Sequence, residues 1–178
     1  PYAITDYYDI DPDLATNVEK RMNEFESLVK RTHKAGLKMI IDFVPNHVAR
    51  QYKSTAKPKG IADFGENDNT GMQFSPQNNF YYCPEQSFAA DIDLYHGEEL
   101  PYEEFPAKAT GNDCFGNRPG RNDWYETVKL NYGVDYCDAG GVSTHFSPTP
   151  DTWKKMLDIL LFWAGKGVDA FRCDMAEM

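Results

Sequence analysis

Apolar side chains recur at helical spacing near the beginning of the chain, separated by charged residues. The apolar positions of this first stripe are Val18, Met22, Phe25, Leu28 and Val29. Their spacing of three and four residues places them on one helical face, which predicts an amphipathic helix over residues 17–34. Gly36 follows at a position typical of the residue that ends a helix.

A second apolar stripe lies near the other end of the chain. Its positions are Trp153, Met156, Leu157, Leu160, Trp163 and Ala164. The stripe predicts a helix over residues 151–164, with Asp151 as its N-cap and with Gly165 and Gly167 as its stop.

Each predicted helix is followed by a short run rich in branched apolar residues. Residues 37–44 and 168–173 both fit parallel strands with apolar cover on each face, and Pro45 ends the first run. Both runs lead directly into polar, catalysis-capable side chains. Helix-then-strand units with chemistry at the strand ends indicate an α/β protein and, specifically, part of a (β/α)₈ barrel.

Residues 48–150 have a different character from the flanking segments. They contain 10 of the 13 glycines and 8 of the 11 prolines, without a sustained helical or strand period. A structureless loop of this length would be abnormal, so we expect an inserted subdomain with a few short strands. Residues 1–47 and 151–178 would then form the partial catalytic barrel.

Charge and cysteine content narrow the class of protein. The net charge of -10 argues against a nucleic-acid partner and is compatible with a neutral substrate such as a sugar. No apolar run approaches the roughly 20 residues of a membrane span. The four cysteines lack a CxxC spacing, and the sequence leaves open one disulfide among the first three or free thiols.

Side-chain alternation brings charged groups together at the strand ends. One face of the later strand holds Val168, Ala170, Arg172 and Asp174, and one face of the earlier strand holds Ile40, Asp42, Val44 and Asn46. If the strands are neighbours, Asp42 reaches Arg172, which would let a barrel bury both charges. A charged Asp174 beside a guanidinium suits a nucleophile that attacks carbon.

Structural alternatives exist for each of these residues. The Asp42–Arg172 pair is favoured as a purely structural ion pair, Asp174 alone as a loop cap, and His47 as a local hydrogen-bonding group. Among the other polar candidates, His33 is favoured as a packing or capping residue and Glu177 as a solvated residue. His96 and His145 lie in the insertion without an identifiable partner. The aromatic clusters Phe80-Tyr-Tyr82 and Trp124-Tyr125 fit either a core of the insertion, which we favour, or platforms for sugar rings.

Several segments resemble the α-amylase family of glycoside hydrolases. Asp42-Phe-Val-Pro-Asn-His47 is similar to the first hallmark motif of that family, D-x-V-x-N-H. Gly167-Val-Asp-Ala-Phe-Arg-Cys-Asp174 is similar to its second, G-x-D-x-[FW]-R-x-D. Tyr2 followed by Thr5-Asp-Tyr7 resembles the loop after the second strand, and residues 48–150 match the subdomain inserted after the third.

The resemblance implies an interrupted (β/α)₈ barrel, of which this chain would hold about strands 3 and 4 with their helices. It also implies cleavage of α-glucosidic bonds with retention. Asp174 would be the nucleophile, and Arg172 would orient that carboxylate and keep it charged. His47 would hydrogen-bond the sugar in the cleavage subsite, and Tyr2 would stack on the same sugar.

Two further roles follow from the resemblance alone. Asp42 would support the strand ends, and Asn46 would be a candidate calcium ligand in members that keep the metal, so calcium stays open as a cofactor. The chain departs from the family pattern after Asp174: Glu177 and Met178 stand where the family often has lysine and histidine. That histidine commonly helps to bind the metal.

The family supplies its acid/base glutamate after strand five, and a retaining glycosidase needs that second carboxyl group. We therefore expect this chain to be an excerpt that is inactive without the remainder of its barrel. The expected substrate is a starch-like α-1,4-glucan or malto-oligosaccharide. The alternatives are α-glucosidase, debranching or glucanotransferase activity, or a non-catalytic sugar-binding relative. A secreted or periplasmic location is favoured over the cytoplasm.

Overall fold

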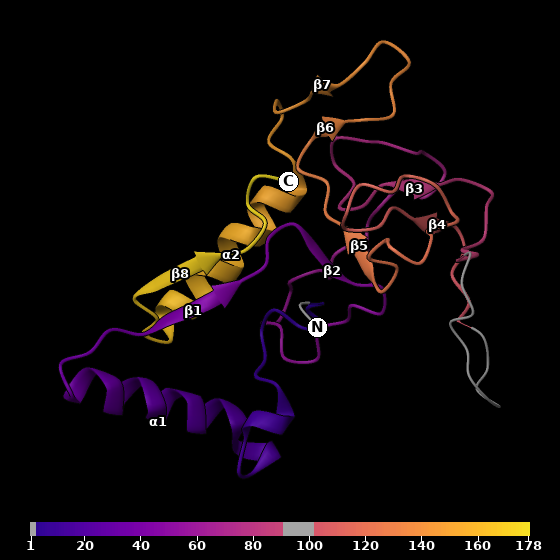
Figure 1. Ribbon diagram of the computed structural model, residues 1–178. Helices are drawn as coiled ribbons and strands as arrows, with labels where there is room; N and C mark the ends of the chain where they lie inside the picture. Colours follow the sequence, from indigo (N-terminus) through magenta and orange to yellow (C-terminus); the bar gives the residue numbers. More distant parts are fainter. Residues whose placement is uncertain (1–2, 91–101) are drawn as a thin grey trace.

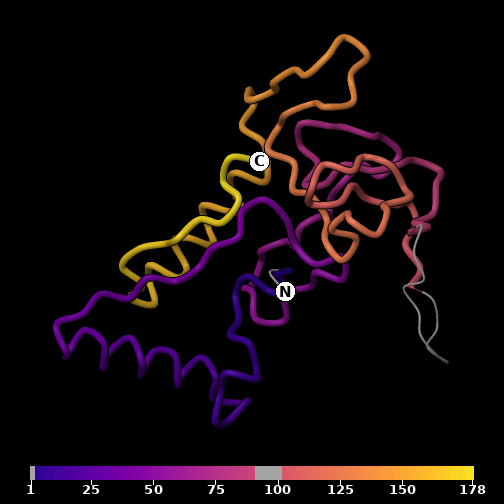
Figure 2. Tube along the Cα trace, in the orientation of Figure 1, coloured from indigo at the N-terminus to yellow at the C-terminus, as the bar shows by residue number. Residues whose placement is uncertain are grey.

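The computed structural model describes residues 3–90 and 102–178, and the part outside the insertion contains two α-helices and two parallel strands (Figure 1). The elements are α1 (Arg21–Lys34), β1 (Ile40–Phe43), α2 (Asp151–Gly165) and β8 (Ala170–Cys173). β1 pairs with β8 in parallel, with Asp42 opposite Arg172. Figure 2 shows the end of the chain running back along β1, which makes neighbours of two segments far apart in sequence. The prediction of two parallel strands is confirmed.

The first helix starts later and ends where the sequence predicts. Two short 3₁₀ helices, η1 (Pro12–Leu14) and η2 (Val18–Lys20), precede α1. Asn17 caps η2, because its side chain accepts a hydrogen bond from the Glu19 amide at 3.1 Å. At the other end Gly36 has a φ of 74°, the left-handed conformation in which glycine avoids a Cβ clash.

The start of α2 corrects the predicted cap. Pro150, with a φ of -55° and a ψ of 145°, occupies the N-cap position, so Asp151 is the first helical residue instead. The carboxylate of Asp151 accepts a hydrogen bond from the Asn79 side chain at 3.0 Å and lies 3.1 Å from the Lys155 ammonium. Asp151 therefore links the helix start to the insertion.

Short antiparallel pairs make up the regular structure of residues 48–150, as the composition predicts. They are β2 (His47–Ala49) with β5 (Thr127–Lys129), β3 (Tyr82–Cys83) with β4 (Ala107–Lys108), and β6 (Val134–Asp135) with β7 (Ser143–Thr144). Side chains satisfy much of the backbone between these strands. The fully buried Asn131 donates to the carbonyls of Ser75 and Asn78 at 2.8 and 2.9 Å and accepts from the Gly133 amide.

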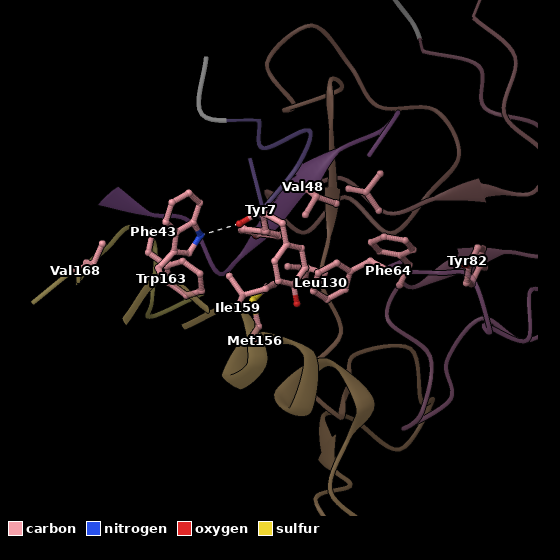
Figure 3. Packing of buried hydrophobic residues seen from close by; sticks show 13 residues of the cluster. Tyr7, Phe43, Val48, Phe64, Tyr82, Leu130, Met156, Ile159, Trp163 and Val168 are labelled. Atoms are coloured by element: carbon pink, nitrogen blue, oxygen red, sulfur yellow. Dashed lines mark hydrogen bonds between the residues drawn. The ribbon is translucent and has the colours of Figure 1, made fainter. Parts of the chain in front are cut away.

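One apolar cluster runs through both parts of the molecule (Figure 3). From the insertion it includes Val48, Phe64, Phe80, Tyr82, Val128 and Leu130, and from α2 it includes Met156, Ile159 and Trp163. The indole of Trp163 donates to the main-chain oxygen of Tyr7 at 2.7 Å, the dashed line in Figure 3. The Phe80-Tyr-Tyr82 aromatics are thus buried core residues, which agrees with the favoured interpretation of that cluster.

Helix α1 packs against the C-terminal end of α2 and the residues that follow it. Its buried residue Val29 lies under Gly167, where an added Cβ would approach the valine side chain to 2.9 Å. The ring of Phe25 meets that of Trp163 edge-on at 5.3 Å, and the Lys166 ammonium pairs with Glu26 at 2.5 Å. These contacts fix α1 against the end of α2. No helix in residues 3–90 and 102–178 is long and apolar enough to cross a membrane.

Candidate active site

The carboxyl ends of β1 and β8 bring three charged side chains together, as strand alternation predicts. A guanidinium nitrogen of Arg172 lies 2.7 Å from Asp174 Oδ1, and the same nitrogen donates to the two carboxylate oxygens of Asp42 at 3.1 and 3.3 Å. These hydrogen bonds with Asp42, together with the nearby Asp174 charge, raise the pKa of Arg172. The guanidinium therefore stays charged and holds two carboxylates in fixed positions.

The three groups differ in their exposure. The Asp174 side chain is 19% exposed, whereas that of Arg172 is 58% exposed and that of Asp42 is also open to solvent. The expected burial of the Asp42–Arg172 pair is therefore not reached in this chain. The physical reason is that β1 and β8 have no further strand beside them among the described residues.

Two features of the backbone hold Asp174 at the strand end. Its amide donates to the Phe43 carbonyl at 2.8 Å, which extends the β1–β8 pairing by one residue. Met175, the next residue, has a φ of 53°, an unusual conformation for a residue with a long side chain. The chain thus turns sharply after Asp174, and the carboxylate faces a cavity instead of continuing the sheet.

His47 lies where β1 passes into the insertion. Its Nδ1 is 3.1 Å from the side-chain nitrogen of Asn46, and that same nitrogen donates to the Gly111 carbonyl at 2.7 Å. Because the Asn46 nitrogen is a donor, this network assigns His47 Nδ1 as the acceptor and places the ring proton on Nε2. The network therefore fixes the orientation of the His47 ring at the start of β2.

Gly111 is a structural requirement for this arrangement, and no pattern in the sequence predicts it. A Cβ at Gly111 would lie 2.7 Å from the Thr127 hydroxyl and 2.8 Å from the Cβ of His47. The bare backbone therefore packs flush against the imidazole and offers its carbonyl to Asn46.

A buried tyrosine, Tyr7, and a half-buried one, Tyr132, hold the turn between β1 and β2. The Tyr7 hydroxyl donates to the Val44 carbonyl at 2.5 Å, and the Tyr132 hydroxyl donates to the Pro45 carbonyl at 2.7 Å. Burial raises the pKa of Tyr7 well above its usual range, so the hydroxyl stays a proton donor. The turn that presents His47 is thereby fixed from two sides.

Asp174 and His47 face a common cavity of about 380 Å³, a size typical of small-ligand sites. Its other lining residues are Ala3, Asp123, Trp124, Tyr125, Glu126, Thr127 and Met175. The Trp124 ring meets the His47 ring edge-on at 5.3 Å and is partly exposed, so it offers an aromatic surface to an occupant. The Trp124-Tyr125 cluster therefore lies at the cavity, and the Phe80-Tyr-Tyr82 cluster is not among its lining residues.

Asp123 is another carboxylate that lines this cavity. Its oxygens accept hydrogen bonds from the Asn112 side chain at 2.9 Å and from the Gly120 amide at 2.7 Å. These bonds, the Asn112 bond first, hold the pKa of Asp123 below its ordinary value. Asp123 is consequently a poor proton donor and fits a role in shaping the loop.

The other polar candidates take structural positions. His33 Nε2 lies 2.7 Å from an Asp169 oxygen, and His145 lies 2.9 Å from the Ser143 hydroxyl. Glu177 is exposed. Tyr2 and His96 lie outside the described residues. All four cysteines are free thiols: Cys83, Cys114, Cys137 and Cys173.

The oxygen of Asn46 that the family resemblance offers to calcium already has a cationic partner. Asn46 Oδ1 accepts a hydrogen bond from the buried Lys129 ammonium at 3.0 Å. In residues 3–90 and 102–178 there is also no cluster of three or more His, Cys, Asp or Glu side chains suited to a metal ion. The residues around Asn46 therefore do not fit a second, divalent cation at this oxygen.

A match to one protein family identifies the relatives of this chain. The family described as "Alpha amylase, catalytic domain" matches residues 1–178, the whole chain. The chain belongs to the alpha-amylase family. The two hallmark motifs of that family thus end at the strand ends where Asp42, Arg172 and Asp174 meet.

Individual alpha-amylase family relatives are distant and much longer. Maltase 1 of Drosophila virilis is 25% identical over 177 residues, which cover 97% of this chain and 22% of that protein. The human amino acid transporter heavy chain SLC3A1 is 25% identical over 183 residues, covering 99% and 21%. Other relatives are named alpha-glucosidase and trehalose-6-phosphate hydrolase. The chain thus spans about a fifth to a quarter of these relatives.

A solved structure shares the fold. The maltogenic amylase of S. marinus superposes with a TM-score of 0.50 at 20% sequence identity, over 98% of this chain and 22% of that one. The alpha-amylase family chain described here is therefore consistent with one part of such a catalytic domain.

Proposed function

We propose that the whole protein is a retaining glycoside hydrolase that cleaves α-1,4-glucosidic bonds of starch-like glucans, with Asp174 as its nucleophile. The observation that carries this proposal is the Asp174 carboxylate, held at 2.7 Å by Arg172 and open to the cavity that it shares with His47. A fixed, charged carboxylate is poised to attack an anomeric carbon. In this assignment β1 and β8 correspond to strands 3 and 4 of the barrel.

The neighbouring side chains have matching roles in this proposal. Arg172 orients the nucleophile through a charge-assisted contact with its carboxylate. His47 hydrogen-bonds the sugar in the cleavage subsite, and Trp124 stacks against a sugar ring. Asp42 holds the other side of the guanidinium. The acid/base carboxyl group and the sugar-stacking Tyr2 complete the site from outside the described residues.

The test is replacement of the nucleophile in the whole protein. Asp174→Asn is expected to lower kcat on maltoheptaose by about 10⁴-fold, since the amide cannot form the glycosyl-enzyme bond. Asp158→Asn, on the exposed face of α2, is the matched control and keeps its activity. Proton NMR of the first product should show the α-anomer, which reports retention. Turnover of Asp174→Asn at the normal rate would reject this assignment.

The proposal of internal α-1,4 cleavage is finer than family membership. Relatives named maltase and trehalose-6-phosphate hydrolase are the reason to test it against other activities. Digestion of maltoheptaose separates the alternatives. Internal cleavage gives mixed short oligomers, α-glucosidase action gives glucose, and glucanotransfer gives chains longer than seven units. Pullulan, with its α-1,6 bonds, reports debranching.

A second candidate is a non-catalytic relative that binds sugar or assembles with another chain. The observation that favours it is the similarity to a protein named as the heavy chain of an amino acid transporter. This candidate predicts no hydrolysis by the whole protein and no effect of Asp174→Asn on function. Detectable turnover of maltoheptaose that depends on Asp174 eliminates it.

A further inference from the structure

A buried lysine lies at the junction between the insertion and the strand ends. Lys129 ends β5, opposite His47 in the β2–β5 pair, and its side chain is 3% exposed. The ammonium lies 2.5 Å from Asp113 Oδ1, 3.0 Å from Asn46 Oδ1 and 3.0 Å from the main-chain oxygen of Met178. Three oxygen partners match the three N–H donors of an ammonium.

These three oxygens come from three different parts of the chain. Asn46 follows β1, Asp113 belongs to a loop of the insertion, and Met178 lies four positions beyond Asp174. A carboxylate, an amide oxygen and a main-chain carbonyl are also the ligand types that bind a hard divalent cation. The ammonium thus gathers oxygens of the types that bind a metal ion, and its own charge repels a second cation placed among them.

We propose that Lys129 is a built-in cation that replaces a divalent ion at this junction and acts as a positioning residue for the catalytic side chains. The Lys129 bond to Asn46 Oδ1 fixes the orientation of that amide, so that its nitrogen faces Gly111 and His47 Nδ1. The bond to Met178 holds the segment that follows Asp174. Its catalytic consequences rest on the proposed hydrolase function, whereas its ion-binding consequences do not.

Two measurements on the whole protein with Lys129 in place test the replacement directly. Thermal unfolding after EDTA treatment is expected to match that of the untreated protein. Metal analysis is expected to give the same calcium content for the protein and for its Asp113→Asn variant. A calcium ion lost on Asp113→Asn, together with a lower Tm in EDTA, would overturn the proposal.

Removing the ammonium should convert the oxygen set into a metal site. Lys129→Ala leaves Asn46 Oδ1, the Asp113 carboxylate and the Met178 carbonyl around the vacated space. Titration calorimetry with calcium chloride is expected to show one new binding event, absent from the unmodified protein and abolished in the double variant Lys129→Ala, Asp113→Asn. Calcium should also raise the Tm of Lys129→Ala selectively. Lack of any calcium response in a folded Lys129→Ala protein contradicts the proposal.

The positioning role has its own readout. Lys129→Ala is expected to lower kcat/KM about 10- to 100-fold, the range seen when a residue that orients a ligand is lost. Calcium should restore most of it, whereas the isosteric Lys129→Met, whose side chain fills the space, should be impaired and unresponsive.

Lys108→Met is the matched control: Lys108 also lies in the insertion and pairs with Glu104 at 2.9 Å. It should show neither calcium binding nor calcium rescue. If Lys129→Ala binds calcium but the whole protein never hydrolyses glucans, the proposed function fails and the built-in cation stands. A calcium response of equal size in Lys108→Met would overturn the specific role of Lys129.

Discussion

The strands that carry the charged triad and the strands of the insertion are held in different ways. β1 and β8 have strongly patterned sequences, yet most of their residues are exposed or half-exposed. β2 and β5 have no recognisable pattern, yet every residue in them is buried. Parallel sheets are ordinarily covered on both faces, so the exposed pair has the character of two strands from a larger sheet.

The two regions also use different chemistry for cohesion. The helices and β1–β8 rely on apolar contacts and regular backbone pairing, whereas the insertion supplements its apolar contacts with asparagine, aspartate and arginine side chains that bind backbone groups. Arg50, for example, is buried with Glu104 at 2.7 Å and also donates to the Tyr125 carbonyl. Irregular segments can therefore be as well covered as regular ones when side chains replace the missing ladders.

The largest expected effect tests whether the two regions share one core. Ile159→Ala removes a side chain of α2 that is 1% exposed and packs in the common cluster. We expect a loss of about 4 kcal/mol from the free energy of unfolding. The control Leu161→Ala, on the 59% exposed face of the same helix, should change it by under about 0.5 kcal/mol. Hydrogen exchange should then accelerate in β2 and β5 as well as in α2; acceleration confined to α2 would mean separate cores.

A polar deletion inside the insertion should cost almost as much. Asn131→Ala removes the side-chain donor to the Ser75 and Asn78 carbonyls and leaves the Gly133 amide without its side-chain acceptor, so we expect a loss of about 3 kcal/mol. The exposed Asn122→Ala is the control and should be nearly neutral. Urea unfolding measures both. Equal stability of the two variants would show that side-chain hydrogen bonds do not hold this region together.

A smaller effect is expected at a helix stop in the patterned region. Gly36→Ala should destabilise by about 1 kcal/mol, because an alanine at a φ of 74° is strained although no atom lies within 4 Å of the added Cβ. Gly165→Ala, at the end of α2 with equally open space, should instead stabilise by up to about 1 kcal/mol. Opposite signs of ΔTm would confirm that backbone conformation, and not space, decides the outcome.

The smallest expected effect is a difference between the two regions in how their stability depends on pH. Hydrogen bonds from the Met39 amide, Lys38 and His33 lower the pKa of Asp169 beside β8, whereas burial raises the pKa of Asp68 in the insertion above its ordinary 3.8. Asp169 therefore contributes stability that is present above pH 3.8 and is lost as pH falls through its lowered pKa. Asp68 has the opposite sign, since protonation between 3.8 and its raised pKa favours the folded state.

Stability curves of Asp169→Asn and Asp68→Asn between about pH 2 and 6 measure these two contributions. Asp169→Asn should remove a slope in which stability rises with pH below 3.8. Asp68→Asn should remove a slope in which stability falls with pH just above 3.8. Parallel curves for the unmodified protein and both variants would contradict the assigned shifts.

The sequence predicted the parts that depend on local periodicity and known motif spacing. The parallel neighbours, the helix stop at Gly36 and the joining of Arg172 to Asp42 and Asp174 all follow from alternation and from the register of two strands. The position of Trp124 at the cavity, the close approach of Gly111 to His47 and the burial of Lys129 could not be predicted. Each depends on where irregular loops meet in space, which no period along the chain encodes.

The apolar cluster that joins Val48 and Leu130 to Met156 and Ile159 has a practical consequence for engineering. Residues 48–150 are not a cassette that can be transplanted into another barrel by cutting at its two ends. A chimera built that way would set foreign side chains against the helix that follows and open voids along the seam. To exchange the insertion between enzymes, the residues on the inward face of α2 would have to be transferred together with it.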